Sequence, residues 1–119
     1  MADDADNDFQ IERKGETVVV RLLAQELTMF HVPELRADVL SLVEEKPPRI
    51  LFDFTRTSFI DSSAIALLFK VAKSIAASGG RMAVSGLRPG LLKVLQAVVQ
   101  QGGISFYDTL DEALAQGAS

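Results

Sequence analysis

One stretch organises the chain: FIDSSAIALLF, residues 59–69, which follows the apolar run RILFDF, residues 49–54. The apolar run is typical of a buried strand, and the stretch after it opens the longest unbroken helical pattern in the sequence. Asp61, Ser62 and Ser63 therefore lie at a predicted helix start, where Asp and Ser side chains accept hydrogen bonds from free backbone N–H groups. A carboxylate and two hydroxyls are thereby placed at the edge of a sheet, which makes this stretch the first place to look for function.

The sequence on either side of this stretch predicts alternating strands and helices. Such alternation predicts an α/β fold whose sheet has a parallel core and an antiparallel edge formed by an N-terminal hairpin. The central strand should be covered on both faces, and the helix after it should be mostly buried. The expected elements are, in chain order, a hairpin (9–13 and 17–23), a connection (25–33), a helix that starts near Val32 and is ended by Pro47-Pro48, the strand 49–54, a helix (63–77) stopped by Gly79-Gly80, a strand (81–85), a helix from Pro89 stopped by Gly102-Gly103, a strand (104–107) and a closing helix capped by Thr109.

Length and composition limit the class of protein. The 119 residues suffice for one domain, expected over residues 9–119, and four aspartates among residues 1–8 predict a disordered acidic leader. The absence of cysteine excludes a disulfide framework, thiolate catalysis and cysteine-ligated zinc.

The distribution of charge and hydropathy bears on the expected cellular compartment and on nucleic-acid binding. No apolar run reaches about 18 residues, and the N-terminus is acidic where a signal peptide would be basic, so we expect a cytoplasmic protein without membrane insertion. The formal net charge is −4 and the pI is near 4.9. Since the 12 basic residues are scattered along the chain, direct binding of nucleic acid is disfavoured.

The catalytic arrangements that the sequence could support are incomplete. A nucleophilic Ser62 or Ser63 would need a base, and the single histidine, His31, stands in a stretch with no second polar partner, where a packing or surface role is expected. Asp53 ends the central strand, but a phosphoaspartate site also needs a magnesium-binding acidic pair and a lysine, which are missing; we expect Asp53 to bond to neighbouring backbone. The nucleophile elbow, P-loop and dinucleotide motifs are absent. We therefore expect no enzymatic activity, cofactor or metal, and a hydrolase using Ser62 is the least favoured alternative.

The same residues resemble a family signature. The runs LFDF (51–54), SFIDSS (58–63) and AIALL (64–68) are together similar to the signature of STAS domains, the anti-sigma factor antagonists of bacterial partner-switching systems. The resemblance extends over about residues 9–116 and includes Gly79-Gly80 and GLRP at 86–89. It implies a small mixed sheet with about four helices packed on it.

The resemblance also implies a function. The unphosphorylated form would bind a GHKL-type anti-sigma factor serine kinase and so free the sigma factor or another target. Phosphorylation of Ser62, or alternatively Ser63, would release the kinase, and a PP2C-type phosphatase would remove the phosphate. The implied partner-binding residues are Glu26, Thr28, Asp61, Ser62, Ser63 and Ala64. The alternative is a STAS scaffold or regulatory subunit of a membrane transporter or stressosome-like complex, without a phosphorylation cycle.

Two positions depart from the usual signature. Family members usually carry GELD or GEID after the second strand, whereas this chain has QELT at residues 25–28, so that Thr28 replaces a carboxylate. Ala64 and Ala66 replace the glycines of a GLG run. Because alanine favours a helix by about 0.5–1 kcal/mol over glycine, we expect a stiffer helix start.

Overall fold

A five-stranded mixed sheet forms the centre of the molecule. The structure, a computed structural model, describes residues 8–98 and 103–117. The strand order is β1-β2-β4-β6-β7, with only β1 and β2 antiparallel. This confirms the predicted parallel core with an antiparallel N-terminal hairpin. The strands are β1 (Phe9–Lys14), β2 (Thr17–Leu22), β4 (Arg49–Asp53), β6 (Arg81–Ser85) and β7 (Ile104–Tyr107).

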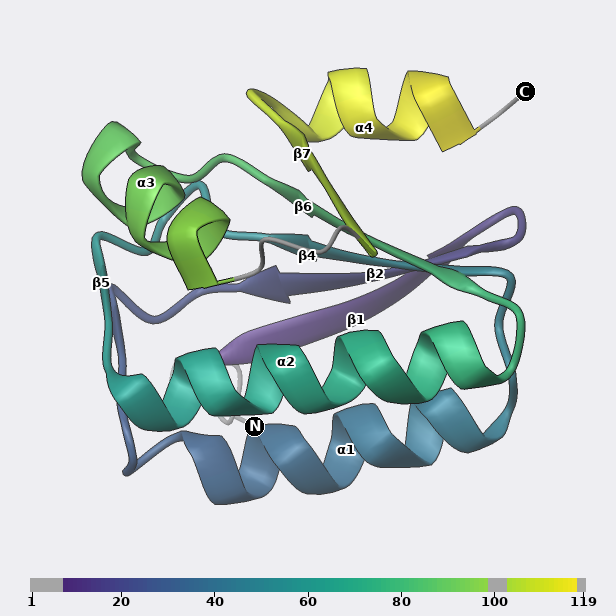
Figure 1. Cartoon of the computed structure of the whole chain (residues 1–119), viewed down its shortest axis with the longest axis horizontal. Coiled ribbons are helices and arrows are strands. Elements are labelled where there is room, and N and C mark those ends of the chain that lie inside the picture. The colour runs from purple at the N-terminus through teal and green to yellow at the C-terminus, as the bar shows by residue number, and fades with distance from the viewer. Residues whose placement is uncertain (1–7, 99–102, 118–119) are drawn as a thin grey trace, which may run out of the picture.

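Within the described ranges, four helices cover the sheet. Figure 1 shows α1 and α2 side by side across one face, α4 on the opposite face, and α3 at the end where β5 (Phe59–Ile60) lies. None of the described helices is long and apolar enough to cross a membrane. The helices are α1 (Val32–Glu44), α2 (Ser62–Ala77), α3 (Pro89–Val98) and α4 (Leu110–Gly117).

Successive strand residues point to opposite faces of the sheet and fill two cores. Phe52, at the middle of β4, belongs to the larger core, which α1 and α2 cover. Its neighbour Leu51 belongs to the smaller core, where Val19 and Ala83 pack with Ala113 of α4. Strand β4 is therefore covered on both faces, as the unbroken apolar run 49–54 predicts.

Two expectations about secondary structure are corrected. Helix α2 was expected to be mostly buried, but of its 16 residues only Ala64, Leu67, Leu68, Val71, Ala72 and Ile75 are buried. A helix that lies on a sheet turns its remaining side chains to solvent, so even Phe69 is 39% exposed. The connection 25–33 contains β3 (Glu26–Leu27), which pairs in parallel with β5 (Phe59–Ile60). Strands of two residues show no alternation that a sequence pattern could reveal.

Three of the predicted helix boundaries are confirmed by the structure. Helix α1 ends at Glu44, before Pro47-Pro48, and Gly79, at φ +89°, follows α2 as the predicted left-handed stop. Thr109 caps α4, since its Oγ1 accepts from the backbone N–H of Glu112 at 3.1 Å. Gly102 and residues 1–7 of the expected leader lie outside the described residues.

Candidate functional site

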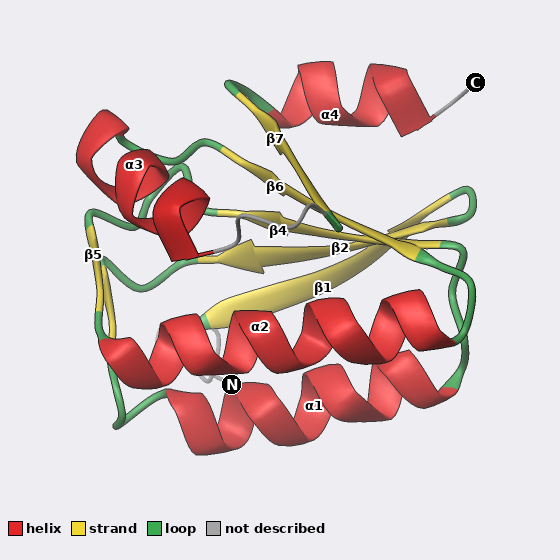
Figure 2. Ribbon diagram, viewed as in Figure 1, coloured by secondary structure: helices red, strands yellow, loops and turns green. Residues whose placement is uncertain are grey.

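Two segments far apart in the sequence meet at one end of the sheet. Residues 25–31 and 58–63 lie side by side there, beyond the carboxyl end of β4, and we call this region the serine end (Figure 2). The carbonyl of Gln25 accepts from Ser58 N at 2.8 Å, and that of Leu27 accepts from Asp61 N at 3.1 Å. Backbone hydrogen bonds therefore hold the start of α2 against the loop that precedes α1.

Asp61 is the residue that fastens these two segments together. Its Oδ1 accepts from the Ser63 hydroxyl at 2.6 Å and from Ala64 N at 3.1 Å, so Asp61 caps α2 as predicted. Its Oδ2 accepts from Met29 N, in the other segment, at 2.9 Å. The Ser63 hydroxyl, followed by the backbone N–H groups of Ala64 and Met29, lowers the pKa of the Asp61 carboxyl. Asp61 is accordingly a carboxylate at neutral pH.

The two serines after Asp61 have different environments. Ser62 is the first residue of α2 and is exposed. Ser63 is half-buried, and its hydroxyl donates to Asp61. Of the two candidate phosphoacceptors, Ser62 thus offers the more accessible hydroxyl.

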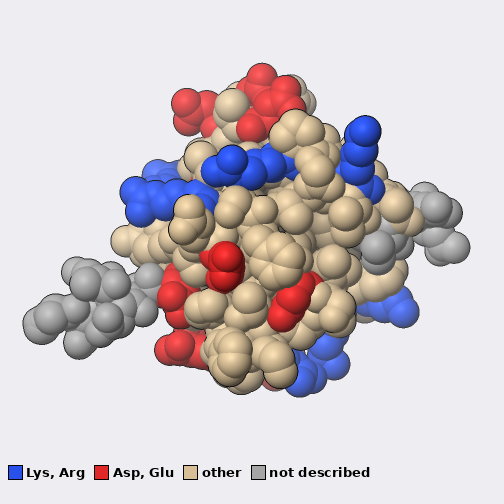
Figure 3. Space-filling view, turned by 90° about the vertical axis from the view of Figure 1, so that its left-hand side faces the viewer, with Lys and Arg blue, Asp and Glu red and all other residues tan. Residues whose placement is uncertain are grey.

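Large apolar side chains are exposed at the serine end. Phe30 is 87% exposed, Met29 62% and Phe59 48%, and we call these three residues the apolar patch. Figure 3 views the molecule from this end, where uncharged surface fills the centre with acidic groups among it and basic groups around the edge. Exposed apolar surface of this kind marks protein interaction sites. The apolar patch was not predicted from the sequence, although two adjacent large apolar residues, Met29 and Phe30, in an expected connection could have indicated it.

A groove runs from the serine end between α1 and α2. Its volume is about 260 Å³, and Ser63, Val32 and Leu67 contribute to its lining. Arg36 and Lys70, both exposed, lie along it. A partner that packs on the apolar patch can therefore reach an amphipathic groove with a positive rim.

The expected contact residues in the loop before α1 take different roles. Glu26 is exposed. Thr28 is engaged in the turn before α1, where its N–H donates to His31 Nδ1 at 3.2 Å and its Oγ1 accepts from Phe30 N at 3.3 Å. His31 Nε2 also lies 3.8 Å from a carboxylate oxygen of Asp8. His31 therefore has polar partners, contrary to the expectation from its neighbours in sequence.

Ala64 was expected to face a partner, but its side chain is fully buried. It belongs to the larger core together with Leu67 and Leu68. Because no part of its methyl group reaches the surface, Ala64 can affect a partner only through the packing of α2.

Asp53 is a buried structural carboxylate. It is 4% exposed, and its Oδ1 accepts from the hydroxyls of Thr55 at 2.8 Å and Ser85 at 2.9 Å. These partners are side chains, whereas the sequence predicted neighbouring backbone. Gly86, at φ +77°, packs against the Asp53 carboxylate and Thr55. A Cβ at this position would lie 2.5 Å from Thr55 Oγ1. These contacts fix the chain as it leaves β4 toward the serine end.

No metal site is evident in the part of the chain that the structure describes. Across residues 8–98 and 103–117, no group of three or more His, Cys, Asp or Glu side chains is placed to hold a metal ion.

Comparisons with known proteins agree with this architecture. The family model described as STAS domain matches residues 8–113. The structure of the anti-sigma factor antagonist SpoIIAA in its unphosphorylated form is 29% identical, with 92% of this chain and 96% of that chain covered and a TM-score of 0.75. The Bacillus cell fate determinant SpoIIAA in the phosphorylated form is 30% identical, with coverage of 91% and 97% and a TM-score of 0.74.

A third solved structure is similar over nearly its whole length. The anti-sigma-factor antagonist (STAS) domain protein from Planctomyces limnophilus is 26% identical, with 95% of this chain and 100% of that chain covered and a TM-score of 0.84. A search of curated proteins gave no match. The match of the family model over residues 8–113, together with the shared fold, shows that this chain belongs to the STAS domain family.

Proposed function

We propose that this chain is an anti-sigma factor antagonist of a bacterial partner-switching pathway. Its unphosphorylated form binds an anti-sigma serine kinase of the GHKL type, and phosphorylation of Ser62 releases that kinase. The observation that carries the proposal is the pair of serines at the start of α2: Ser62 is exposed, whereas the Ser63 hydroxyl is held by Asp61 at 2.6 Å. Solved structures of SpoIIAA in unphosphorylated and phosphorylated forms, 29% and 30% identical to this chain, support it.

The apolar patch supplies the affinity of the unphosphorylated form. Phe30, Met29 and Phe59 lie in the two segments that meet at the start of α2 and are exposed. Covering a side chain of this size removes apolar area from water and stabilises a complex by about 1.5–3 kcal/mol. A partner seated on the patch would also contact Ser62, because Asp61 ties Met29 to the helix start.

A phosphate on Ser62 would change this surface without unfolding the domain. It adds about −1.5 to −2 charges and several acceptor oxygens. The free N–H groups and dipole of α2 favour an anion at that position, which offsets the repulsion from ionised Asp61. A partner packed on the patch would have to desolvate the dianion, at a cost of several kcal/mol if it is unpaired, and its affinity would fall by orders of magnitude.

The same switch assigns the chain its enzymatic status, its phosphatase and its compartment. The chain is a substrate of the kinase and is not itself an enzyme, since its single histidine, His31, is engaged with Thr28 and Asp8. A PP2C-type phosphatase returns it to the binding form, and the cycle takes place in the cytoplasm.

A second candidate function is a scaffold or regulatory subunit, in a membrane transporter or stressosome-like complex, without a phosphorylation cycle. Thr28 favours it, because the position where the signature usually has a carboxylate is here engaged with His31 in a turn. Kinase and phosphatase genes beside the coding gene would favour the switch, whereas transporter genes would favour the scaffold.

A pull-down with the cognate anti-sigma kinase tests the proposal. Ser62→Ala should retain the kinase, and Ser62→Asp should lose it by about 100-fold or more in affinity. Ser63→Ala is the matched control and should bind as Ser62→Ala does. Equal binding by Ser62→Ala and Ser62→Asp, both shown to be folded, would contradict the switch.

A further inference from the structure

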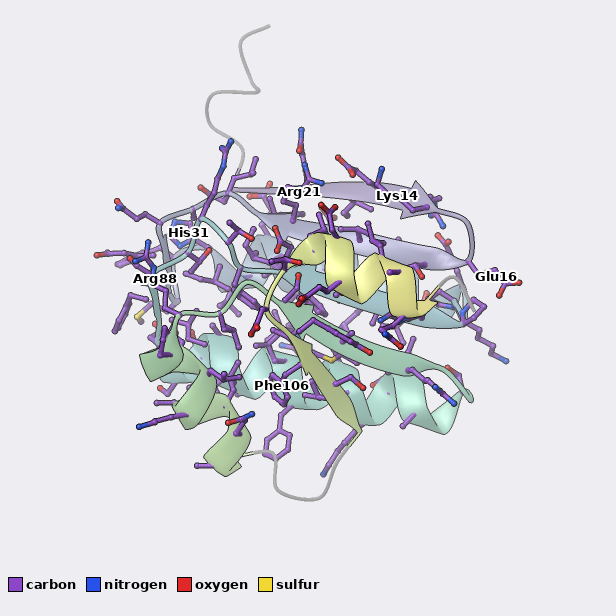
Figure 4. The ribbon with its side chains drawn as sticks, turned by 90° about the horizontal axis from the view of Figure 1, so that it is seen from above. Lys14, Glu16, Arg21, His31, Arg88 and Phe106 are labelled. Atoms are coloured by element: carbon purple, nitrogen blue, oxygen red, sulfur yellow. The ribbon has the colours of Figure 1, made fainter. Side chains whose placement is uncertain are left out.

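A cavity of about 390 Å³ lies at the end of the sheet opposite Ser62, where the parallel strands β4 and β6 begin. We call this region the arginine end. Figure 4 looks down on α4, whose carboxyl-terminal end points toward the turn that carries Glu16. The cavity is bounded by residues of β2, β4, β6 and β7, by this turn and by the end of α4, and its lining includes Arg49, Arg81, Glu16, Ser105, Tyr107 and Gln116.

The strand register places two arginines side by side in the lining of this cavity. Arg49 and Arg81 are the first residues of β4 and β6 and are direct partners in the parallel register. They therefore lie on the same face of the sheet, which is the α4 face, two residues before Leu51 and Ala83 of the smaller core. Like charges on directly opposed residues are unfavourable. Within residues 8–98 and 103–117, neither arginine forms an ion pair.

Arg49 is held in place but lacks an acceptor. Its guanidinium lies over the ring of Tyr107, with Cζ 5.7 Å from the ring centroid. Its Nη1 is buried and has no hydrogen-bond partner. A buried charged donor without an acceptor is costly, and native proteins rarely contain one unless a ligand or water completes it. The Nη1 group of Arg49 is thus available to an acceptor that enters the cavity from outside.

We propose that this cavity binds a small oxyanion, namely the phosphate or carboxylate group of a metabolite-sized ligand. The planar guanidinium fork matches the oxygens of carboxylates and phosphates, and Arg81, on the neighbouring strand, adds a second fork. The volume lies within the range of about 300–1,000 Å³ that small-molecule sites occupy. Glu16 at the rim offsets one of the two positive charges and leaves the lining with one net positive charge.

Such a ligand would act on a different part of the fold from the Ser62 switch. It would join β4 and β6 to β7 and α4, through Ser105, Tyr107 and Gln116. Anything that binds only the folded state raises its stability according to concentration. Binding here does not depend on the proposed function, and Ser62→Ala should leave it unchanged.

Thermal unfolding of the full chain tests the proposal, with inorganic phosphate and succinate as separate probes and sodium chloride to hold ionic strength constant. We expect a saturable rise in Tm with at least one probe, and the more effective probe indicates whether the natural ligand carries a phosphate or a carboxylate. Arg81→Gln, at an exposed position, should weaken the apparent affinity at least 10-fold, whereas Glu16→Gln should strengthen it. Arg88→Gln removes an exposed arginine outside the cavity and is the matched control, expected to behave as wild type.

The site of binding is read from backbone amide chemical shifts during the same titrations. Amides of Arg49, Arg81 and Ser105 should move with the probe, and that of Ser62 should not. The proposal is overturned if neither anion gives a saturable change beyond that of chloride. It is equally overturned if Arg81→Gln binds as wild type, or if the shifts gather around Ser62. Because Arg81 is exposed, its substitution should leave the fold intact, and the test stays decisive.

Discussion

The serine end and the arginine end lie at opposite ends of the five-stranded sheet and present different surfaces. At the serine end, backbone pairing and Asp61 hold two loops together, and the surface presents Phe30 and Met29 to solvent. At the arginine end, the starts of β4 and β6 place two arginines in the lining of a cavity partly closed by α4. Exposed apolar surface suits a protein partner, whereas a partly closed cavity lined by two arginines suits a small anion. The two proposals therefore assign one kind of ligand to each end.

The largest expected effect comes from the core that joins the two ends. Phe52 lies in the middle of β4 and is fully buried. Phe52→Ala should lower the free energy of unfolding by about 3–5 kcal/mol, because it leaves a cavity in the larger core. Urea denaturation measures this loss. Phe30→Ala, at the serine end, is the control and should change the free energy of unfolding by about 0.5 kcal/mol or less; equal losses for both variants would contradict the assignment of Phe30 to the surface.

The next largest effect concerns kinase binding, which we expect to depend on the serine end and not on the arginine end. Phe30→Ala should weaken binding of the unphosphorylated chain to the anti-sigma kinase by about 2 kcal/mol, or about 30-fold, because it removes a large apolar contact. Titration calorimetry with the purified kinase measures the affinity. Arg81→Gln, at the arginine end, should leave that affinity at the wild-type value. If Arg81→Gln weakens the complex as much as Phe30→Ala does, the partner does not distinguish the two ends.

A smaller effect concerns the pH dependence of the serine end. The pKa of Asp61 is lowered from 3.8 in the folded chain, so the carboxylate stabilises the fold at pH values above 3.8, and this contribution is lost as pH falls through the folded pKa. Asp61→Ala should therefore lower Tm at pH 7, and the difference from wild type should shrink in strongly acidic buffer. Thermal denaturation monitored by circular dichroism measures both values. A difference that stays constant between pH 7 and acidic buffer would show that the charge of Asp61 does not contribute.

The smallest effect concerns a surface ion pair away from both sites. Arg13 Nη2 lies 2.9 Å from Glu45 Oε1, and both side chains are more than half exposed, at 57% and 52%. Arg13→Gln should change the free energy of unfolding by less than about 1 kcal/mol, and salt should reduce the difference further. Chemical denaturation at low and high salt measures it. A larger loss that persists in high salt would show that this pair holds the hairpin against α1.

The sequence predicts the parts of this molecule that local pattern controls. The apolar run 49–54, the hairpin around Gly15 and the cap at Asp61 all appear where their residues predict them, because each depends on neighbours in the chain. The pairing of β3 with β5 joins residues about 30 positions apart through strands of two residues, which leaves no periodic signal. For the same reason the exposure of Phe59 could not be read from the sequence.

The arginine end could not be predicted from the sequence either, because it depends on the long-range register of the strands. Arg49 and Arg81 stand 32 positions apart and become neighbours only through the pairing of β4 with β6. Asp53 and His31 have partners of the same kind, in Ser85 and Asp8. Sequence reasoning could name the residue types at these positions but could not pair them.

Mass spectrometry of phosphopeptides from the protein in its native cell tests the central claim most directly. The chain would be purified from exponential and stationary cultures with phosphatases inhibited, and the peptide that spans Asp61 to Lys70 would be sequenced. The Ser62 switch predicts phosphate on Ser62 in at least one growth phase, with Ser63 unmodified. Phosphate on Ser63 instead, or an unmodified peptide in both phases, would contradict it.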